Sequence, residues 1–340
     1  MSLQIDEVDP FDDDALATWL DVTNTVDRFE RGDAATAWTF EELKVGAREP
    51  NKNRKTVRLN GAVDGVVVAT GQVELPLLDN LTAAEVDVAV LPEHRRQGHG
   101  TDLLAAVEQI AREHQRSRFD AMTAWRYDGP PDGTGTSGVE FAKSHGYVFG
   151  LGDVQREVTL PVDDAILDKL AAEAAERSGD YELRSWSGPI PDDLLLGYLE
   201  LSSTLMTEAP MGDIDYEPEA VDIEAHRMRE AMWAKQGRTM FTTVALDSDG
   251  TLAAYTDLMV PTHDSTRIYQ WGTLAGRDHR GHRLGLAVKI ANLRALQANG
   301  DHDGRRLTTW NAEVNDHMIA INQLMGFEPT ARAGELQKKV

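Results

Sequence analysis

The feature that most constrains this chain of 340 residues is an internal repeat at a fixed spacing. The segment HRRQGHG at 94–100 returns as HRGHRLG at 279–285, and TAW at 123–125 returns as TTW at 308–310. Both pairs are 185 residues apart (279 − 94 and 308 − 123). An offset that persists over more than thirty residues indicates a duplicated structural unit. The length is sufficient for two domains that each bury a core.

Each copy of the repeat follows a predicted strand and opens a predicted helix, which makes it a candidate anion site. The first N–H groups of a helix lack intrahelical partners, and the helix dipole adds positive charge there, so phosphate binds well. Gly98 and Gly100 let the backbone approach a ligand closely, and Arg95 and Arg96 supply charged donors. No GxxxxGK[ST] is present, and Leu103 stands where a dinucleotide fingerprint needs its third glycine.

The run VAVLPEHRRQGHG at 88–100 resembles the acyl-CoA signature of the GNAT superfamily of N-acyltransferases, R/Q-x-x-G-x-G/A at a helix start. Arg95, Gly98 and Gly100 fill its three fixed positions. In the second copy Arg280 and Gly285 match, and Arg283 replaces the first glycine. The resemblance implies that loop amides hold the CoA pyrophosphate and that the preceding strand pairs with the pantetheine arm. The implied cofactor-binding residues are Val88, Val90, Arg95, Arg96, Gln97, Gly98, His99, Gly100, Thr101, Arg280, Gly281, Gly285 and Asn315.

The end of each copy also resembles the family. Residues 315–327 are similar to its last helix, N-x-x-A-x-x-x-Y-x-x-x-G-F. Asn315 suits an N-cap, and the resemblance implies that it faces the CoA arm. The tyrosine that protonates the leaving thiolate in the family is replaced by Asn322 in the second copy and by Ala142 in the first.

These observations predict an α/β fold with two GNAT-like units in tandem, each a mixed, mostly antiparallel central sheet flanked by helices. The layout is similar to that of proteins resembling mycothiol synthase. We expect an N-terminal unit at 1–160, a linking helix at 161–180 and a C-terminal unit at 181–340. Periodicity and turn residues predict helices at 12–45, 98–115, 163–178, 191–206, 221–235, 283–299 and 315–325, and strands at 56–73, 84–91, 239–247, 251–260, 267–275 and 305–311.

Acylation of an amine requires a base for the amine proton and a donor for the oxyanion. Glu85 and Asp87 lie on one face of the predicted strand 84–91, near the family's usual base position, although both could simply face solvent. The backbone N–H of Val90 is the candidate oxyanion donor. In the second copy the aligned residues are Gln270 and Gly272, which leaves Asp257 on the preceding strand as the candidate base or as a hydrogen-bonded structural carboxylate.

The amino-acid composition limits the classes of partner and cofactor that we expect for this chain. The net charge of −23 repels nucleic-acid phosphates. It favours cationic acceptors such as amines, although its simplest role is to aid solubility. The absence of cysteine removes thiolate metal sites and a cysteine nucleophile, and no HExxH-type spacing occurs, so we expect no metal. No run approaches the ~20 apolar residues of a membrane helix, and the N-terminus lacks the features of a signal peptide, which favours a cytoplasmic location.

The sequence therefore predicts an acyl-CoA-dependent N-acyltransferase, with acetyl-CoA as cosubstrate, that acts on a small amine by direct transfer. The expected assembly is a monomer or a homodimer. The alternative is a non-catalytic acyl-CoA-binding or scaffold protein, favoured by the two missing tyrosines. An NAD-type dehydrogenase lacks its glycine fingerprint here.

Overall fold

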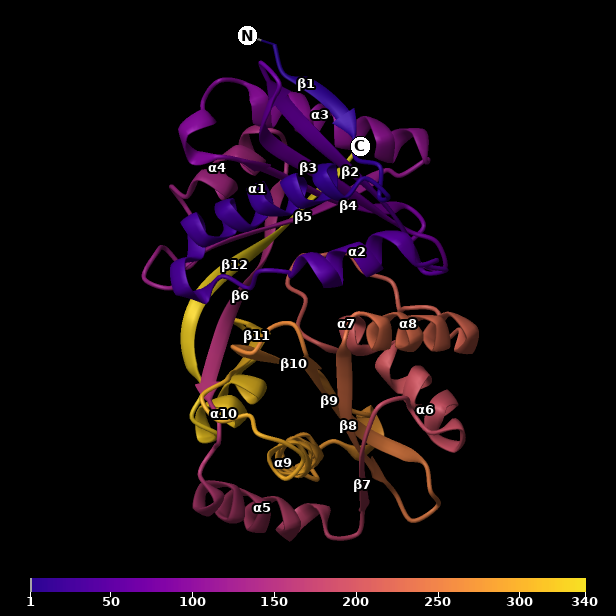
Figure 1. Cartoon of the computed structure of the whole chain (residues 1–340). Coiled ribbons are helices and arrows are strands. Elements are labelled where there is room, and N and C mark those ends of the chain that lie inside the picture. The colour runs from indigo at the N-terminus through magenta and orange to yellow at the C-terminus, as the bar shows by residue number, and fades with distance from the viewer. Residues whose placement is uncertain (1) are drawn as a thin grey trace. The chain divides into compact units, whose positions relative to one another are not determined.

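The computed structural model describes residues 2–340 and divides them into two compact units (Figure 1). Unit 1 comprises the chain up to Val154 together with Met211–Tyr216 and Thr330–Val340. Unit 2 comprises Gln155–Pro210 and Glu217–Pro329. Each is an α/β unit with a mixed, mostly antiparallel sheet flanked by helices, as the sequence predicts.

In unit 1 the strands follow the order β1-β2-β3-β4-β5-β12-β6. The strands are β1 Gln4–Glu7, β2 Arg54–Val63, β3 Val66–Pro76, β4 Ala83–Val90, β5 Arg118–Arg126, β6 Val148–Thr159 and β12 Glu328–Lys339, and the helices are α1 Asp13–Arg31, η1 Gly32–Ala34, α2 Phe40–Arg48, η2 Pro92–His94, α3 His99–Glu113 and α4 Ser137–Ser144.

The two faces of the unit 1 sheet differ because side chains alternate along each strand. One face of β2, β3 and β4 is apolar and packs on α3, where Leu103 and Val107 are fully buried. Gly71 permits this close approach, since a Cβ there would lie 3.0 Å from Val107 Cγ1. The other face is polar and lies toward α1, whose Ala15 carbonyl accepts from Asn60 at 3.2 Å.

Two predictions for this region are wrong. The strand predicted at 56–73 is the hairpin β2–β3, which turns at Asp64 and Gly65, both with positive φ. An Asp-Gly pair between alternating apolar residues is the usual signal of such a turn. The helix predicted at 12–45 is divided into α1 and α2, because Gly32 adopts φ 61° and Thr39 starts a new helix with a capping box to Glu42.

In unit 2 the strands follow the order β6-β11-β10-β9-β8-β7. The strands that lie wholly in this unit are β7 Glu182–Ser187, β8 Arg238–Leu246, β9 Leu252–Pro261, β10 Arg267–Ala275 and β11 Arg306–Ala312, and the helices are α5 Asp164–Ser178, α6 Asp192–Ser202, α7 Leu205–Glu208, α8 Ile223–Lys235, η3 Arg277–His279, α9 Leu284–Gln297 and α10 Asp316–Leu324.

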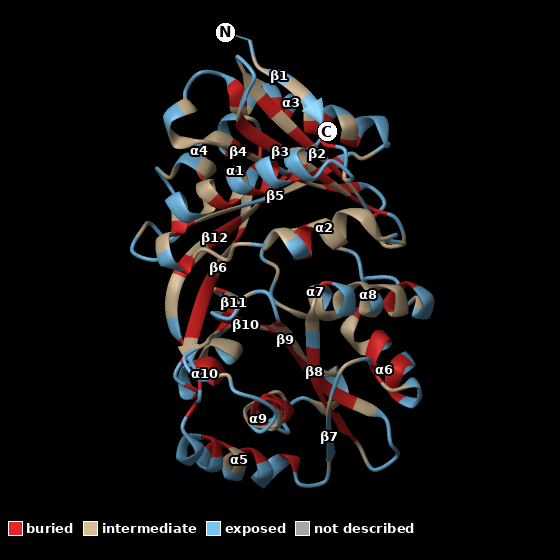
Figure 2. Cartoon of the chain, viewed as in Figure 1, coloured by how far each residue is buried: buried red, intermediate tan, exposed pale blue. Residues whose placement is uncertain are grey.

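The helix predicted as a linker at 161–180 is α5, and it is part of the unit 2 core. Its Leu167 and Leu170 are buried together with Ile290 and Leu293 of α9. Figure 2 shows α5 with buried residues along one side and exposed residues along the other. This amphipathic pattern is typical of a helix that covers a core rather than of one that only connects domains.

Most of the last strand lies outside the C-terminal unit that the sequence predicts at 181–340. β12 pairs antiparallel with β5, from Ala331 opposite Arg126 to Lys339 opposite Arg118, and Thr330–Val340 therefore belongs to unit 1. β6 begins in unit 1 and ends in unit 2. Which strand a terminal segment pairs with is decided by tertiary contacts, and alternation within the segment carries no signal for it.

Candidate functional site

Each unit contains two central parallel strands that pair only at one end and then diverge. β4 pairs with β5 over Ala83–Glu85 and Arg118–Asp120, although β4 continues to Val90 and β5 to Arg126. In unit 2, β10 pairs with β11 over Arg267–Tyr269 and Arg306–Thr308 and then separates from it. The sheet of each unit therefore opens where the strand leads into the repeated loop.

The backbone of the diverging strands faces this opening. The N–H of Leu91 donates to the Val68 carbonyl on β3 at 3.0 Å. Because N–H groups alternate in direction along an antiparallel strand, those of Val88 and Val90 point away from β3, toward the opening. In unit 2 the Gly276 N–H donates to the Ala253 carbonyl at 2.9 Å, and the same alternation directs Ala275 toward its opening.

The repeated loops have the same backbone shape although their residues differ. Arg96 and Gly98 have φ of 62° and 93°, and the corresponding Gly281 and Arg283 have φ of 87° and 54°. Arginine and glycine have thus exchanged places between two left-handed positions. Throughout residues 2–340, the amides of 96–101 and of 281–286 have no hydrogen-bond partner, so both helix N-termini present free donors.

The side chains of the unit 1 loop differ in whether they form hydrogen bonds within the fold. Arg95 donates to the Val90 carbonyl at 3.1 Å and to Glu30 at 2.6 Å, so its guanidinium is committed to the fold. Thr101 Oγ1 lies 3.1 Å from His145 Nε2. The remaining residues of the predicted group are His99, which is buried, and Arg96, Gln97, Gly98 and Gly100. Arg96 is the exposed cation of this loop.

The loop arginines of unit 2 are also held by the fold. Arg280 donates to Glu208 of α7 at 2.6 Å. Arg283 donates to the Glu173 carbonyl of α5 at 3.0 Å, so its side chain is directed to α5. Gly285 lies in the first turn of α9, where a Cβ would be 3.9 Å from Thr273 and from Ile321. The substitution at the first signature glycine thus leaves the loop amides free of partners.

The last helix of unit 2 contains a buried polar network. Asn315 caps α10 by accepting the Met318 N–H at 3.2 Å. Asn322, at the family's tyrosine position, accepts from Lys289 Nζ at 2.7 Å and donates to Asn311 at 2.6 Å. Burial lowers the pKa of Lys289 to about 7. Sequence reasoning missed Lys289, whose only signal is its apolar setting in LAVKIANL.

The two candidate bases of unit 1 have different surroundings. Glu85 is in the last row that β4 shares with β5, and it accepts from Arg54 at 2.8 Å. Burial raises the pKa of Glu85, and Arg54 opposes this. Asp87 lies one row further, where the strands have diverged, and among the described residues it has no hydrogen-bond or ion-pair partner.

The residue Asp87 is more than a third exposed, yet the dense protein around its carboxyl group penalises the charge. Desolvation, followed by repulsion from Asp27 and Glu74, raises the pKa of Asp87 to about 6. Asp87 is therefore an accessible carboxylate whose pKa is raised toward neutral pH.

Further carboxylates on the same face were missed by sequence reasoning. Asp120 on β5 lies opposite Glu85, and Gln337 of β12 donates to it at 2.9 Å. Two residues along β12, Glu335 hydrogen-bonds Asp153 of β6, and burial with repulsion from Asp153 raises the pKa of Glu335 to about 8. The strand pattern predicts which face these residues share, but their strands come together only in the fold.

In unit 2 the aligned residue Gln270 and the candidate base Asp257 are buried. Gln270 is buried, and its Nε2 donates to the Asp257 carbonyl at 2.7 Å. Asp257 is 4% exposed and accepts from Tyr198 and Thr242, each at 2.7 Å. Desolvation raises the pKa of Asp257 to about 6. Both carboxylate oxygens of Asp257 thus have donors, which matches the structural alternative that the sequence left open.

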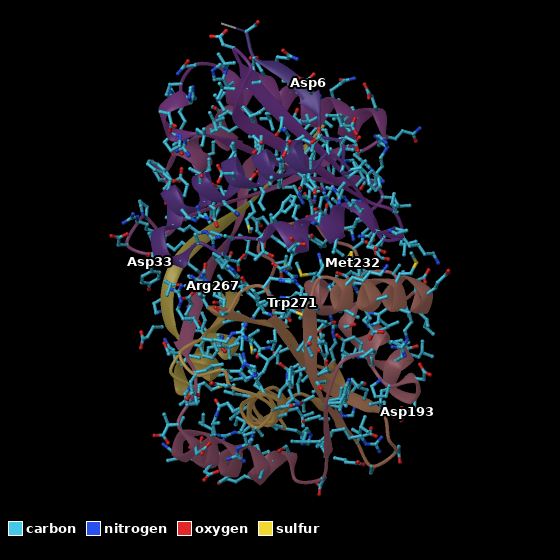
Figure 3. All side chains as sticks on the ribbon, in the orientation of Figure 1. Asp6, Asp33, Asp193, Met232, Arg267 and Trp271 are labelled. Atoms are coloured by element: carbon cyan, nitrogen blue, oxygen red, sulfur yellow. The ribbon has the colours of Figure 1, made fainter. Side chains whose placement is uncertain are left out.

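Unit 2 instead presents an aromatic residue at this point of the strand. The register of β10 against β9 shifts between Gln270 and Thr273, and Trp271 lies in this bulge. Figure 3 labels Trp271 among the side chains of the unit. Its ring lies 5.3 Å from that of Trp233 on α8, measured between centroids. An aromatic residue therefore stands between Gln270 and Gly272, the two positions that align with the carboxylate pair of unit 1.

Comparison with known proteins identifies the fold and the family of its first unit. Residues 16–125 match the family described as "Acetyltransferase (GNAT) family". A solved tandem GNAT protein from the clavulanic acid biosynthesis pathway, determined without AcCoA, is 25% identical, with 99% of this chain and 98% of that chain covered and a TM-score of 0.78. The chain carries a GNAT domain in a tandem GNAT fold.

More distant structures share this tandem GNAT fold. A GCN5-related N-acetyltransferase from Sphaerobacter thermophilus is 14% identical, with 99% of this chain and 95% of that chain covered and a TM-score of 0.67. Saccharomyces cerevisiae N-myristoyltransferase is 12% identical, with 99% and 80% covered and a TM-score of 0.57. At these identities the likeness concerns the fold alone. No curated protein matches the sequence.

None of the helices formed by residues 2–340 is long and apolar enough to cross a membrane. Among the same residues, no group of three or more His, Asp or Glu side chains is arranged to hold a metal ion.

Proposed function

We propose that the chain is an acetyl-CoA-dependent N-acetyltransferase that acts on a small amine by direct transfer, and that unit 1 performs the reaction. The observation that carries the proposal is the position of Asp87. It is an accessible carboxylate that has no partner within residues 2–340, it has a pKa of about 6, and it lies on the diverging part of β4. The free backbone donors of Val88 and Val90 belong to the same stretch.

The residues of unit 1 would hold acetyl-CoA mainly through the backbone. The amides of 96–101 suit the pyrophosphate, because a helix N-terminus with free N–H groups attracts anions. Arg96 adds an exposed cation beside them. Val88 offers its peptide group to the pantetheine arm in the manner of an added strand, and the Val90 N–H is the candidate donor for the oxyanion.

In the proposed reaction Asp87 accepts a proton from the substrate ammonium, whose pKa is near ~10.4 when unperturbed. The neutral amine nitrogen attacks the thioester carbonyl carbon and forms the C–N bond of a tetrahedral intermediate. The nitrogen then releases its second proton to water, and the C–S bond breaks as the amide forms. The CoA thiolate, with a pKa near ~8.5, leaves and takes its proton from water. This route needs no tyrosine, which is consistent with Ala142 at that position.

Unit 2 is less suited to the chemistry. Gln270 and Gly272 are not bases, and Asp257 is buried with both oxygens engaged. Its loop still offers free amides, so it can serve as a second acyl-CoA-binding unit. In the alternative function, both units bind acyl-CoA or act as a scaffold and neither catalyses a reaction. The absence of the tyrosine from both copies favours this alternative.

The test measures thiol release from acetyl-CoA with a panel of small amines, for wild type, Asp87→Asn and Glu85→Gln. Asp87→Asn should lower kcat/KM by about 10²–10⁴-fold, the usual contribution of a positioned base. Glu85→Gln should lower it far less, because Glu85 is neutralised by Arg54. In wild type kcat/KM should rise as the pH passes about 6, and this rise should be missing in Asp87→Asn.

Calorimetric titration of acetyl-CoA provides the control, since both variants should bind it as wild type does. Binding without turnover of any amine would favour the scaffold alternative. Full activity of Asp87→Asn would remove Asp87 from the mechanism.

A further inference from the structure

Arg58 of β2 is a charged side chain of unit 1 without an anionic contact. Among the described residues its guanidinium has no hydrogen-bond partner, and its Nε is buried. The guanidinium lies over the Trp19 ring, 5.2 Å from the centroid. Burial lowers the pKa of Arg58, and only Glu74 acts in the opposite direction. Because a buried charge without a partner is costly, such groups in folded proteins are usually paired or bind a ligand.

The strand register places Arg58 in the same row as Asp87. Arg58 lies opposite Gln72, and Gln72 lies opposite Asp87, so the three side chains share the face that is turned away from α3. Neighbouring strands are about 4.8 Å apart, which puts the Cα atoms of Arg58 and Asp87 roughly 10 Å apart. The amide of Gln72 is engaged with Glu74 at 3.0 Å. The row therefore ends in a cation and a carboxylate for which the described part of the chain provides no hydrogen-bond or ion-pair partner.

Neighbouring arginines on this face are different. Arg54, four residues away on the same side of β2, is paired with Glu74 at 3.1 Å and with Glu85 at 2.8 Å. Arg118 of β5 is paired with Asp120 at 3.3 Å. The fold thus neutralises these cations with its own carboxylates, and it leaves Arg58 without one. An external anion is the group that would complete the site.

We propose that Arg58 binds a carboxylate carried by the amine acceptor, so that the acceptor class is an amino acid with its amine directed to Asp87. The inference rests on the proposed function. A guanidinium binds a carboxylate through two parallel N–H···O bonds of about 2.8 Å. The amine at the other end of the acceptor would donate a hydrogen bond of similar length to Asp87. A short molecule that carries both an amine and a carboxylate therefore spans the distance from Asp87 to Arg58. Simple amines and polyamines lack the group that Arg58 recognises.

The experiment compares kcat/KM for matched acceptors: amino acids, their carboxamides and the corresponding decarboxylated amines. Wild type should prefer the amino acid by about 10–100-fold, the effect of one charge-assisted pair of about 1.5–3 kcal/mol. Arg58→Met should lose this preference mainly through a higher KM for the amino acid. Arg58→Lys should restore part of it. Arg126→Met, which removes an exposed arginine of the same unit, should retain it.

The outcomes separate the inference from the proposed function. If wild type acetylates decarboxylated amines as well as amino acids, or if Arg58→Met lowers both alike, the role of Arg58 is refuted and the acetyltransferase stands. If no acceptor of either kind is acetylated, the proposed function itself fails. Unchanged acetyl-CoA binding by Arg58→Met shows that the variant is folded, so a lost preference then reports on the acceptor alone.

Discussion

Replacing Lys289 of α9 by methionine should stabilise the protein at neutral pH and lose this advantage at alkaline pH. Lys289 is 2% exposed, its Nζ donates to Asn322 at 2.7 Å, and no acidic side chain among the described residues pairs with it. Burial lowers its pKa from 10.5 to about 7. Methionine has a similar length and carries no charge.

The direction of the change in stability with pH follows from whether the folded or the unfolded chain binds the lysine proton. Between pH 7 and 10.5 the unfolded chain keeps the lysine proton and the folded unit releases it, so wild-type stability rises with pH across this window. At pH 7 the depressed pKa corresponds to roughly 4–5 kcal/mol of lost stability. Methionine removes this cost but leaves Asn322 Oδ1 without its donor, which costs about 1–3 kcal/mol. The net gain is about 1–4 kcal/mol at pH 7, and a net loss of about 1–3 kcal/mol is expected above pH 10.5.

Scanning calorimetry of wild type and Lys289→Met at pH 7 and pH 10 measures this reversal. Lys169→Met, which replaces an exposed lysine of α5 in the same unit, is the matched control and should change stability equally little at both pH values. A Lys289→Met variant whose stability difference from wild type is the same at both pH values would contradict the assignment of a buried, largely neutral amine.

Two further predictions concern the loops and Asp257. Gly98→Trp and Gly281→Trp introduce the same side chain at left-handed positions where a Cβ meets no atom within 4 Å, so both strain the backbone alike. Only Gly98→Trp should abolish amine acetylation, and equal loss of turnover in the two variants would contradict catalysis by unit 1. For Asp257, whose pKa is raised to about 6, wild-type stability should fall by up to about 3 kcal/mol as the pH rises from 4 to 7, and urea unfolding of Asp257→Asn should lack this slope.

The sequence by itself determined the features that depend on neighbouring residues. The repeat predicted two units, alternation predicted β4 and β10, and Asn315 was expected at the start of α10, where it caps the helix. The loop shape is also local, because Arg96 with Gly98 and Gly281 with Arg283 place left-handed backbone at matching positions. These features arise from side-chain period, turn conformation and capping, which act over a few residues.

Only the tertiary structure decided which of the predicted groups are available for chemistry. Glu85 is neutralised by Arg54, 31 residues earlier, whereas Asp87, two positions along the same strand, has no partner in the described chain. Asp257 is closed off by Tyr198, and the strand that completes the unit 1 sheet comes from the end of the chain. Ionisation and strand pairing depend on atoms that are distant in sequence, and the spacing of residues along the chain does not record them.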